Sequence, residues 1–390
     1  MISFNEAFEI VCTLPVFNTT ETVPFDKSTD RILAENIFSD IDMPPFDKSA
    51  VDGFACRKED IAGQMKIIET VPAGKLPQKE IVKNTCIRIM TGAPLPAGAD
   101  TVLMVELCDV NDEMVLFKGK ASNSNIAYKG EDIKTGALLM QASLQIKPQH
   151  IAVLAAVGKT EIEVFKKINV GVISTGNELV EPFYKPSEAQ IRNSNSWQLV
   201  SQVEKHGGKP KYYGIASDDF NETVNTLQNA VNENDLVLLS GGVSAGDFDF
   251  VPKAMNQIGF DILFDSIAVQ PGRPTTLAKK DKKFIIGLPG NPVSSFIQFE
   301  LLGSVLMGRM MGKSVETKVI KGIVGSDFKR KKAERKSFYP VSIDNMGNLV
   351  PLEYHGSAHI NSLINAVGFI SLEIGQYEIK KGTEIDVRLL

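Results

Sequence analysis

Apolar runs and helical patterns alternate between residues 168 and 312 of the chain. Short apolar runs predict strands at residues 170–174, 212–215 and 236–239. Between them, apolar residues recur at helical spacing, which predicts helices at 195–206 and 220–231. Strands and helices in this order are typical of a mostly parallel sheet covered by helices on both faces. Ligands of such sheets bind beyond the carboxyl ends of the strands.

The segments on either side of this region show other patterns. Apolar residues at helical spacing predict an amphipathic helix within residues 3–17, ending before Pro15. Short β runs cut by Pro and Gly occupy residues 20–165 and resume after residue 316, with a hairpin turn at 345–348. The pattern predicts an α/β multidomain protein that ends in a small β-barrel or sandwich. Within 20–165 it predicts strands at 101–107 and 114–117 joined through Asn111 and Asp112, a helix at 148–156 and a strand at 161–165.

Length and composition are those of a folded protein with several domains. The 390 residues are enough for two to four domains of about 150 residues each. Hydrophobic residues make up 43% and charged residues 23%, which excludes a fibrous or disordered chain. The net charge of -5 provides no basic field for nucleic acid. The basic run at 329–336 is interpreted as a solvated turn, because no aromatic residues interleave with it.

The cysteines and the N-terminus favour a reducing compartment. Cys12, Cys56, Cys86 and Cys108 are far apart and form no CxxC pair. The first residues lack the basic start and the cleavage site of a signal peptide. Near-apolar stretches such as 151–157 are under half the roughly 20 residues that cross a bilayer. We therefore expect a soluble, cytoplasmic protein.

Three loops in the α/β region follow apolar strands and precede helices. They cover residues 174–178, 240–247 and 287–295 and are rich in Gly, Ser and Asn. Glycines let backbone N–H groups approach a ligand, and a helix N-terminus favours anions, so such loops suit phosphates. A single loop of this kind is equally well a capped tight turn, whereas three at one sheet edge predict one pocket. No P-loop signature and no GxGxxG fingerprint are present, which disfavours NTPase and hydride chemistry.

Acidic side chains accompany these loops: Glu178, Asp218, Asp219, Asp247 and Asp249. Carboxylates beside a phosphate repel it unless a hard cation lies between them, and magnesium usually takes one or two carboxylates plus phosphate oxygens. A bridging Mg2+ is therefore predicted, although Asp218 or Asp219 alternatively caps the following helix. The turn at 271–274 adds the guanidinium of Arg273, a good partner for an oxyanion.

Eight motifs follow one another along the chain: PPFDKSAVDGFA, IRIMTGAPLPAGAD, KGEDI, VISTGNEL, IRNSN, SGGVSAGDFDF, PGRP and GLPGNPVSS. In this order and with these separations they closely resemble the molybdopterin molybdenumtransferases of molybdenum-cofactor synthesis, which include the E domain of gephyrin. The resemblance spans essentially the whole chain. It implies an elongated, four-domain subunit that forms a homodimer. The implied parts are an N-terminal helix packed on the α/β domain (1–18), a linking domain (19–38 and 137–166), a β-rich insert (39–136), the α/β molybdopterin-binding domain (167–313) and a C-terminal β-barrel (314–390).

The resemblance also implies the chemistry. Enzymes of this family take adenylated molybdopterin and molybdate, insert molybdenum into the dithiolene and release AMP with Mg2+. Their pocket lies between the α/β domain of one subunit and the insert of the other. By motif match the catalytic residues are Asp52, Thr91, Asp132, Glu178 and Asp249, of which Glu178 and Asp249 hold the metal. The matching substrate-binding residues are Ser174, Thr175, Gly176, Asp218, Gly241, Gly242, Ser244, Pro271, Arg273, Gly290, Asn291, Pro292 and Ser294.

This sequence departs from the family pattern at three places. Val51 replaces a common methionine, Gln270 replaces a lysine before Pro271 at the cost of one positive charge, and Val367 replaces an asparagine in the last domain. Two other functions fit parts of the pattern: adenylylation of molybdopterin, which the 168–312 region resembles, and a non-catalytic scaffold. The insert disfavours the first and the retained acids disfavour the second. The upstream adenylyltransferase and acceptor molybdoenzymes are the expected protein partners.

Overall fold

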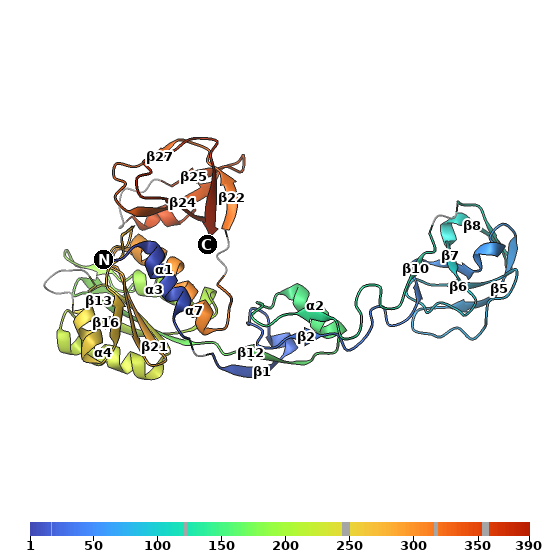
Figure 1. Ribbon diagram of the computed structural model, residues 1–390, viewed down its shortest axis with the longest axis horizontal. Helices are drawn as coiled ribbons and strands as arrows, with labels where there is room; N and C mark the ends of the chain where they lie inside the picture. The colour runs from blue at the N-terminus through green and yellow to red at the C-terminus, as the bar shows by residue number, and fades with distance from the viewer. Residues whose placement is uncertain (17, 121–122, 244–249, 316–318, 353–358) are drawn as a thin grey trace.

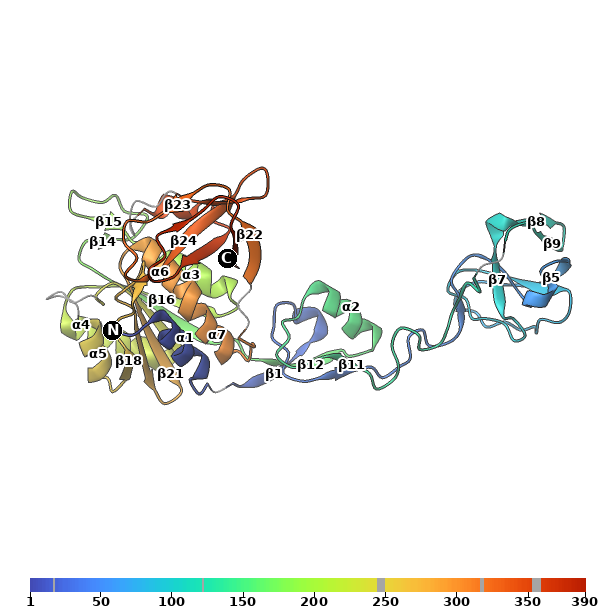
Figure 2. The same ribbon diagram turned by 45° about the horizontal axis from the view of Figure 1, so that its top comes forward.

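The chain forms an elongated molecule made of distinct units (Figure 1). The computed structural model describes residues 1–16, 18–120, 123–243, 250–315, 319–352 and 359–390. An α/β unit and a C-terminal β unit lie together at one end, a linking unit lies in the middle, and a β-rich insert lies at the far end (Figures 1 and 2). None of the helices in these ranges is both long and apolar enough to span a bilayer.

A six-stranded sheet forms the centre of the α/β unit, in the order β16-β13-β17-β21-β20-β18. The first four strands pair in parallel, and β20 alone runs the opposite way, antiparallel to both β21 and β18, which confirms the predicted mostly parallel sheet. The reversed strand β20 lies beyond β21, so it does not interrupt the shared carboxyl edge of the four parallel strands. The strands are β13 (Asn169–Thr175), β16 (Lys209–Ala216), β17 (Leu236–Ser240), β18 (Asp261–Phe264), β20 (Thr276–Lys280) and β21 (Lys283–Leu288).

Helices cover both faces of this sheet because alternate strand residues point to opposite sides. Val170 and Val172 pack into one core and Ile173 into the other. The first core takes α1 (Phe4–Thr13), α3 (Asn195–Lys205), α6 (Pro292–Gln298), the π-helical turn Phe299–Gly303 and α7 (Ser304–Met310), and the second takes α4 (Phe220–Glu233) and α5 (Val251–Gln257). The N-terminal helix is shorter than the segment proposed from the sequence. A capping box between Ser3 and Glu6 begins it, and it ends before Leu14.

The C-terminal β unit is joined to the α/β unit by backbone pairing. Its sheet has the order β19-β24-β26-β28-β22, with β25 beside β24, and a bridge between Val324 and Leu349 closes the ring. β19 (Val269–Gln270) belongs to the α/β part of the chain and pairs with Lys336 and Ser337 of β24. The remaining strands are β22 (Val319–Ile323), β23 (Phe328–Lys329), β24 (Lys336–Ile343), β25 (Leu349–Pro351), β26 (Gly368–Leu372), β27 (Glu378–Ile379) and β28 (Glu384–Leu389).

The linking unit and the insert are built from short strands. In the linking unit β1 (Thr20–Pro24) pairs with β12 (Glu161–Phe165), β2 (Ile37–Phe38) pairs with β11 (Leu138–Met140), and α2 (Pro148–Ala156) completes the core. One strand assignment in the insert was wrong. The strand at 101–107 ends at Met104 and a 3-10 turn follows, so the hairpin joins Cys108–Asn111 to Met114–Phe117. The insert strands are β3 (Lys48–Ser49), β4 (Gly53–Cys56), β5 (Gln64–Val71), β6 (Thr85–Ile89), β7 (Thr101–Met104), β8 (Cys108–Asn111), β9 (Met114–Phe117) and β10 (Ile126–Ala127).

Candidate functional site

A cavity of about 900 Å³ lies at the carboxyl ends of the parallel strands. The loops after β13, β17 and β21, which the sequence singles out, all reach it. Glu178 and Gly290, far apart in sequence, line the same cavity, so the predicted convergence of distant loops is met. The sequence-predicted residues that line it are Ser174, Thr175, Gly176, Glu178, Asp218, Gly241, Gly242, Pro271, Arg273, Gly290, Asn291, Pro292 and Ser294. Ser244 and Asp249 lie outside the described residues.

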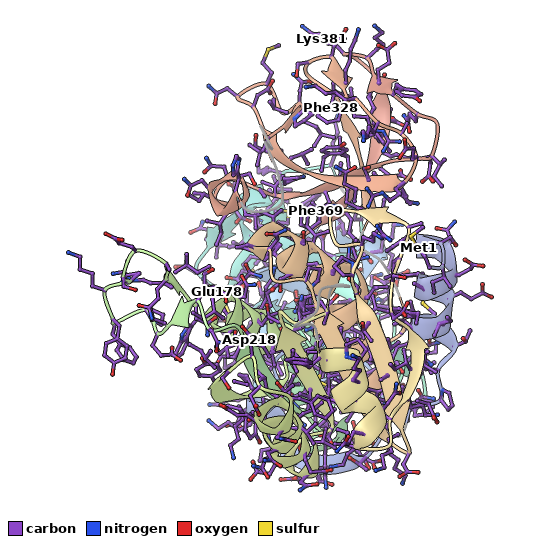
Figure 3. All side chains as sticks on the ribbon, turned by 90° about the vertical axis from the view of Figure 1, so that its left-hand side faces the viewer. Met1, Glu178, Asp218, Phe328, Phe369 and Lys381 are labelled. Atoms are coloured by element: carbon purple, nitrogen blue, oxygen red, sulfur yellow. The ribbon has the colours of Figure 1, made fainter. Side chains whose placement is uncertain are left out.

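One side of the cavity is acidic. Figure 3 shows Glu178 and Asp218 at the same edge of the α/β unit. The Asn177 backbone N–H donates to Asp218 Oδ2 at 3.1 Å, and the Asp218 N–H donates to Asn177 Oδ1 at 3.1 Å. Asp219 instead caps α4 by accepting from the Glu222 N–H at 2.8 Å. The capping alternative therefore applies to Asp219, and Asp218 is left facing the cavity.

The loop after β17 touches the end of β13, and only glycine fits there. Gly241 and Gly242 have φ of 95° and 63°. A Cβ on Gly241 would lie 2.6 Å from the Thr175 carbonyl oxygen, and one on Gly242 would lie 3.0 Å from Thr175 Oγ1. That hydroxyl is buried and has no hydrogen-bond partner in the described structure. An unpaired hydroxyl at a cavity wall is suited to a polar ligand atom.

Two asparagines, to which the sequence analysis gave no role, hold the loops together. Asn195 Nδ2 donates to the Gly290 carbonyl oxygen at 2.7 Å and to Ser240 Oγ at 2.8 Å, and so ties the second loop to the third. Ser174 Oγ donates to Asn193 Oδ1 at 3.0 Å. Both asparagines belong to the IRNSN motif and line the cavity. Their motif was a usable signal, but their partners lie tens of residues away and were not predictable from spacing.

The turn that carries Arg273 is fixed from below by a buried glutamine. Gln298 is 0% exposed, and its Nε2 donates to the Pro271 carbonyl oxygen at 2.8 Å. Thr275 Oγ1 donates to the Gly272 carbonyl oxygen at 2.7 Å. Gly272, with φ of 107°, packs directly on the Gln298 side chain, where a Cβ would overlap it. The Arg273 guanidinium is thus presented by a turn with two side-chain supports.

The C-terminal β unit contributes Arg335 to the same cavity. The pairing of Gln270 with Ser337 places the Arg273 turn beside residue 335, so the two guanidiniums come from neighbouring segments. This corrects the interpretation of the basic run as a solvated turn for Arg335, whereas Lys329, Lys331 and Lys332 are exposed as expected. Arg330, in the same run, is only 9% exposed and donates to the carbonyl oxygens of Gln376 and Arg335 and to Ser337 Oγ, which fixes the fold of the unit.

Asp52, Thr91 and Asp132 do not line this cavity. Asp52 and Thr91 belong to the insert, which lies at the end of the molecule away from the α/β unit (Figures 1 and 2). Asp52 Oδ1 accepts from Thr91 Oγ1 and from the Thr91 N–H, both at 2.6 Å, and these bonds lower the pKa of Asp52. The Asp132 N–H donates to the Met43 carbonyl oxygen at 3.0 Å. Within one chain the two halves of the predicted site are therefore apart.

The cavity offers a magnesium ion only a small number of protein ligands. In the described ranges no group of three or more His, Cys, Asp or Glu side chains could hold a metal. Magnesium needs fewer, because water and substrate phosphates complete its shell. The exposed Glu178 carboxylate lies over Gly176, where a Cβ would be 2.5 Å from Oε2. It has no hydrogen bond or ion pair to the described side chains, so a hard oxygen donor faces the cavity.

These features define an elongated α/β protein whose sheet edge and C-terminal β unit form one cavity, lined by Gly-rich loops, two carboxylates and arginine side chains. The family profiles that match are the MoeA N-terminal region (domain I and II) at residues 2–158, the Probable molybdopterin binding domain at 171–308 and the MoeA C-terminal region (domain IV) at 321–390. The chain belongs to the MoeA family of molybdopterin molybdenumtransferases.

Individual relatives agree with this assignment over nine-tenths or more of their lengths. The chain is 35% identical to a molybdopterin molybdenumtransferase of Staphylococcus aureus strain Mu50 over 379 residues, covering 94% of this chain and 90% of that one. A Staphylococcus epidermidis molybdopterin molybdenumtransferase is 34% identical over 399 residues, covering 100% and 95%. The crystal structure of molybdopterin biosynthesis moeA protein from Pyrococcus horikoshii OT3 superposes with a TM-score of 0.86 at 30% identity, covering 100% of both chains.

Proposed function

We propose that the protein transfers molybdenum from molybdate to adenylated molybdopterin, with release of AMP and formation of molybdenum cofactor. The observation that supports it most is the meeting of three Gly-rich loops with Arg273 and Arg335 around one cavity, in a chain of the MoeA family. The adenylated pterin carries phosphates and molybdate is a second anion. Both have to be held close together, so a site for this reaction requires fixed positive charge.

The residues of the cavity supply that charge with little reorganisation. Each guanidinium offers paired N–H donors that match an oxyanion or phosphate. The turn that carries Arg273 is fixed by Gln298, so the N–H donors of Arg273 are positioned before the substrate arrives. The buried Thr175 hydroxyl, which has no protein partner in the described structure, is free to donate to a substrate oxygen.

Magnesium is part of this proposal. Glu178 would hold it, together with Asp249. When bound, the ion would supply positive charge between carboxylates and phosphate oxygens. Asp218 borders the same space, so loss of the ion would leave two carboxylates facing the phosphates and would weaken substrate binding.

The insert residues enter the site only from a second subunit. Asp52, Thr91 and Asp132 are proposed to face the cavity of the partner in a homodimer, since they do not reach the cavity of their own chain. Thr91 keeps the Asp52 carboxylate oriented and ionised for the metal-insertion end of the substrate. The adenylyltransferase that makes the substrate and the molybdoenzymes that accept the product are the proposed partners, in the cytoplasm.

Turnover tests this function directly. Purified protein is supplied with adenylated molybdopterin, molybdate and Mg2+, and AMP and metal-loaded pterin are followed together. Equal amounts of both products are expected, and Glu178→Gln should abolish both, while Glu188→Gln, on the arm beyond β14 (Leu179–Val180), should behave as the unmodified protein. Formation of pyrophosphate from molybdopterin and ATP would instead identify an adenylyltransferase. Partner binding without any turnover would identify a scaffold.

A further inference from the structure

A second cavity, of about 560 Å³, lies where three units of the chain meet. Its walls come from the linking unit, which contributes Arg31, from Lys167 between β12 and β13, from the end of α3 at Lys205, and from β28 at Arg388. β1 and β12, which carry the linking unit and the insert, reach the α/β unit at this junction (Figure 1). No residue lines both cavities, so the second one is separate from the site described above.

The lining of this cavity carries excess positive charge in an acidic protein. Seven of its lining residues are Lys or Arg and three are Asp or Glu. Arg31 pairs with Glu21, and Lys147 pairs with Asp30 at 2.6 Å. Lys167 and Lys205 form no ion pair with any residue the structure describes, and the charge of Lys205 also lowers the pKa of the buried Glu300 carboxylate.

The two lining arginines outside the linking unit are bound to backbone rather than to carboxylates. Arg309 donates to the Val11 carbonyl oxygen at 2.6 Å. Arg388 donates to the carbonyl oxygens of Glu300 and Leu301. Carbonyl oxygens orient a guanidinium but do not neutralise it. The buried Glu300 carboxylate compensates part of the Arg388 charge.

The one buried acid in the wall cannot neutralise all of them. Glu300 is 5% exposed and lies in the π-helical turn. Gln202 Nε2 donates to its Oε1 at 2.7 Å, and His206 Nε2 lies 3.0 Å from its Oε2. Burial raises the pKa of Glu300, but His206, Gln202 and the charge of Lys205 outweigh it and lower that pKa below its usual value. Its charge acts on Lys205 and Arg388, whereas Lys167 belongs to another segment.

We propose that this second cavity binds a compact polyvalent anion of the phosphate class, held by Lys167, Lys205 and Arg388. The donors approach from three different segments, which suits a tetrahedral oxyanion with oxygens on several sides better than a flat carboxylate. A bound anion would connect the linking segment to the α/β and C-terminal units. It would thereby limit the swing of the linking unit, and with it the insert. The proposal goes beyond metal insertion and shares no residue with it.

Calorimetric titration of the full chain with pyrophosphate tests the proposal. Two pyrophosphates per chain are expected, one at each cavity. Lys167→Glu/Lys205→Glu changes two exposed side chains. It should weaken pyrophosphate binding at the second cavity by about tenfold or more, which corresponds to roughly 1.4 kcal/mol or more. The control Lys75→Glu/Lys83→Glu makes the same charge change on the insert and should leave the pyrophosphate affinity of both cavities unchanged. Arg273→Ala should weaken only the other site.

Hydrogen exchange identifies where the second anion binds. Pyrophosphate should slow exchange at residues 29–32 and 387–390 in the unmodified protein and in Arg273→Ala, and not in Lys167→Glu/Lys205→Glu. The neutral variant Lys167→Gln should show a smaller loss of affinity in the same direction. The proposal is wrong if the double variant binds pyrophosphate as its charge-matched control does, or if protection at 29–32 is absent. Either result leaves the turnover assay unaffected, so the two proposals fail separately.

Discussion

Replacement of Gln298 by methionine separates stability from function at the Arg273 turn. Gln298 is fully buried, its Nε2 donates to the Pro271 carbonyl oxygen, and its Oε1 is buried without a partner among the residues that the structure describes. Methionine has a similar length and fills the space under Gly272. The lost bond leaves a buried carbonyl unsatisfied, at a cost of about 1–3 kcal/mol. Removal of the unpaired Oε1 returns about the same amount, so the free energy of unfolding should change by less than about 1.5 kcal/mol.

Function should respond differently, because the support for the turn is gone. We expect AMP to bind Gln298→Met about tenfold more weakly, with the free energy of unfolding nearly unchanged. Urea denaturation and calorimetric titration of the same preparation measure both quantities. Gln228→Met, on the outer helix α4, is the matched control and should change neither. A loss of more than about 3 kcal/mol in stability would refute the cancellation, and unchanged AMP affinity would refute the positioning role.

Three further changes test other parts of the structure. Thr91→Val removes one of the hydrogen bonds that lower the pKa of Asp52, so that pKa should rise toward its ordinary value. The stability that this bond contributes is present above the Asp52 pKa of the unfolded chain and is lost as pH falls through the pKa of the folded protein. A carbon-detected NMR titration that finds no rise in the Asp52 pKa would contradict this. Arg335→Ala should weaken AMP or molybdate binding about tenfold, more at low salt, whereas Lys332→Ala should not, and equal binding by both variants in calorimetry would show that Arg335 does not contact the anion. Burial raises the pKa of Cys56 and Cys86 to about 12 and of Cys108 to about 11, so at pH 8 these thiols should react with a disulfide reagent only after unfolding; fast reaction of the native protein would mean that the insert core opens.

The convergence of the three loops was predictable because parallel strands share a carboxyl edge. Ser174, Ser240 and Leu288 lie in register across β13, β17 and β21, so the loops that follow them had to meet. The resemblance then separated a molybdenum site from other phosphate sites. Local spacing was sufficient in both steps, since each used short motifs on recognisable strands.

The supports of the site were not predictable, because they depend on contacts between distant segments. Asn195 reaches Gly290, 95 residues away, and Gln298 reaches Pro271, 27 residues away. Arg335 lines the cavity only because β19 leaves the α/β unit and pairs with β24. The basic run contains one buried arginine, Arg330, and one arginine that lines the cavity, Arg335. Composition alone does not distinguish them from solvent-exposed arginines. The strand at 101–107 failed for a related reason: its apolar residues continue past Met104, but the backbone turns there.

Mixing two inactive variants tests most directly whether the cavity of one subunit and the insert of the other form the molybdenum-insertion site. Glu178→Ala damages the cavity and Asp52→Ala damages the insert, so each homodimer should release no AMP from adenylated molybdopterin. After subunit exchange at equal amounts, half of the dimers contain one intact site, and about a quarter of the unmodified activity should return. No recovery, after exchange has been verified by native mass spectrometry, would contradict a site shared between subunits.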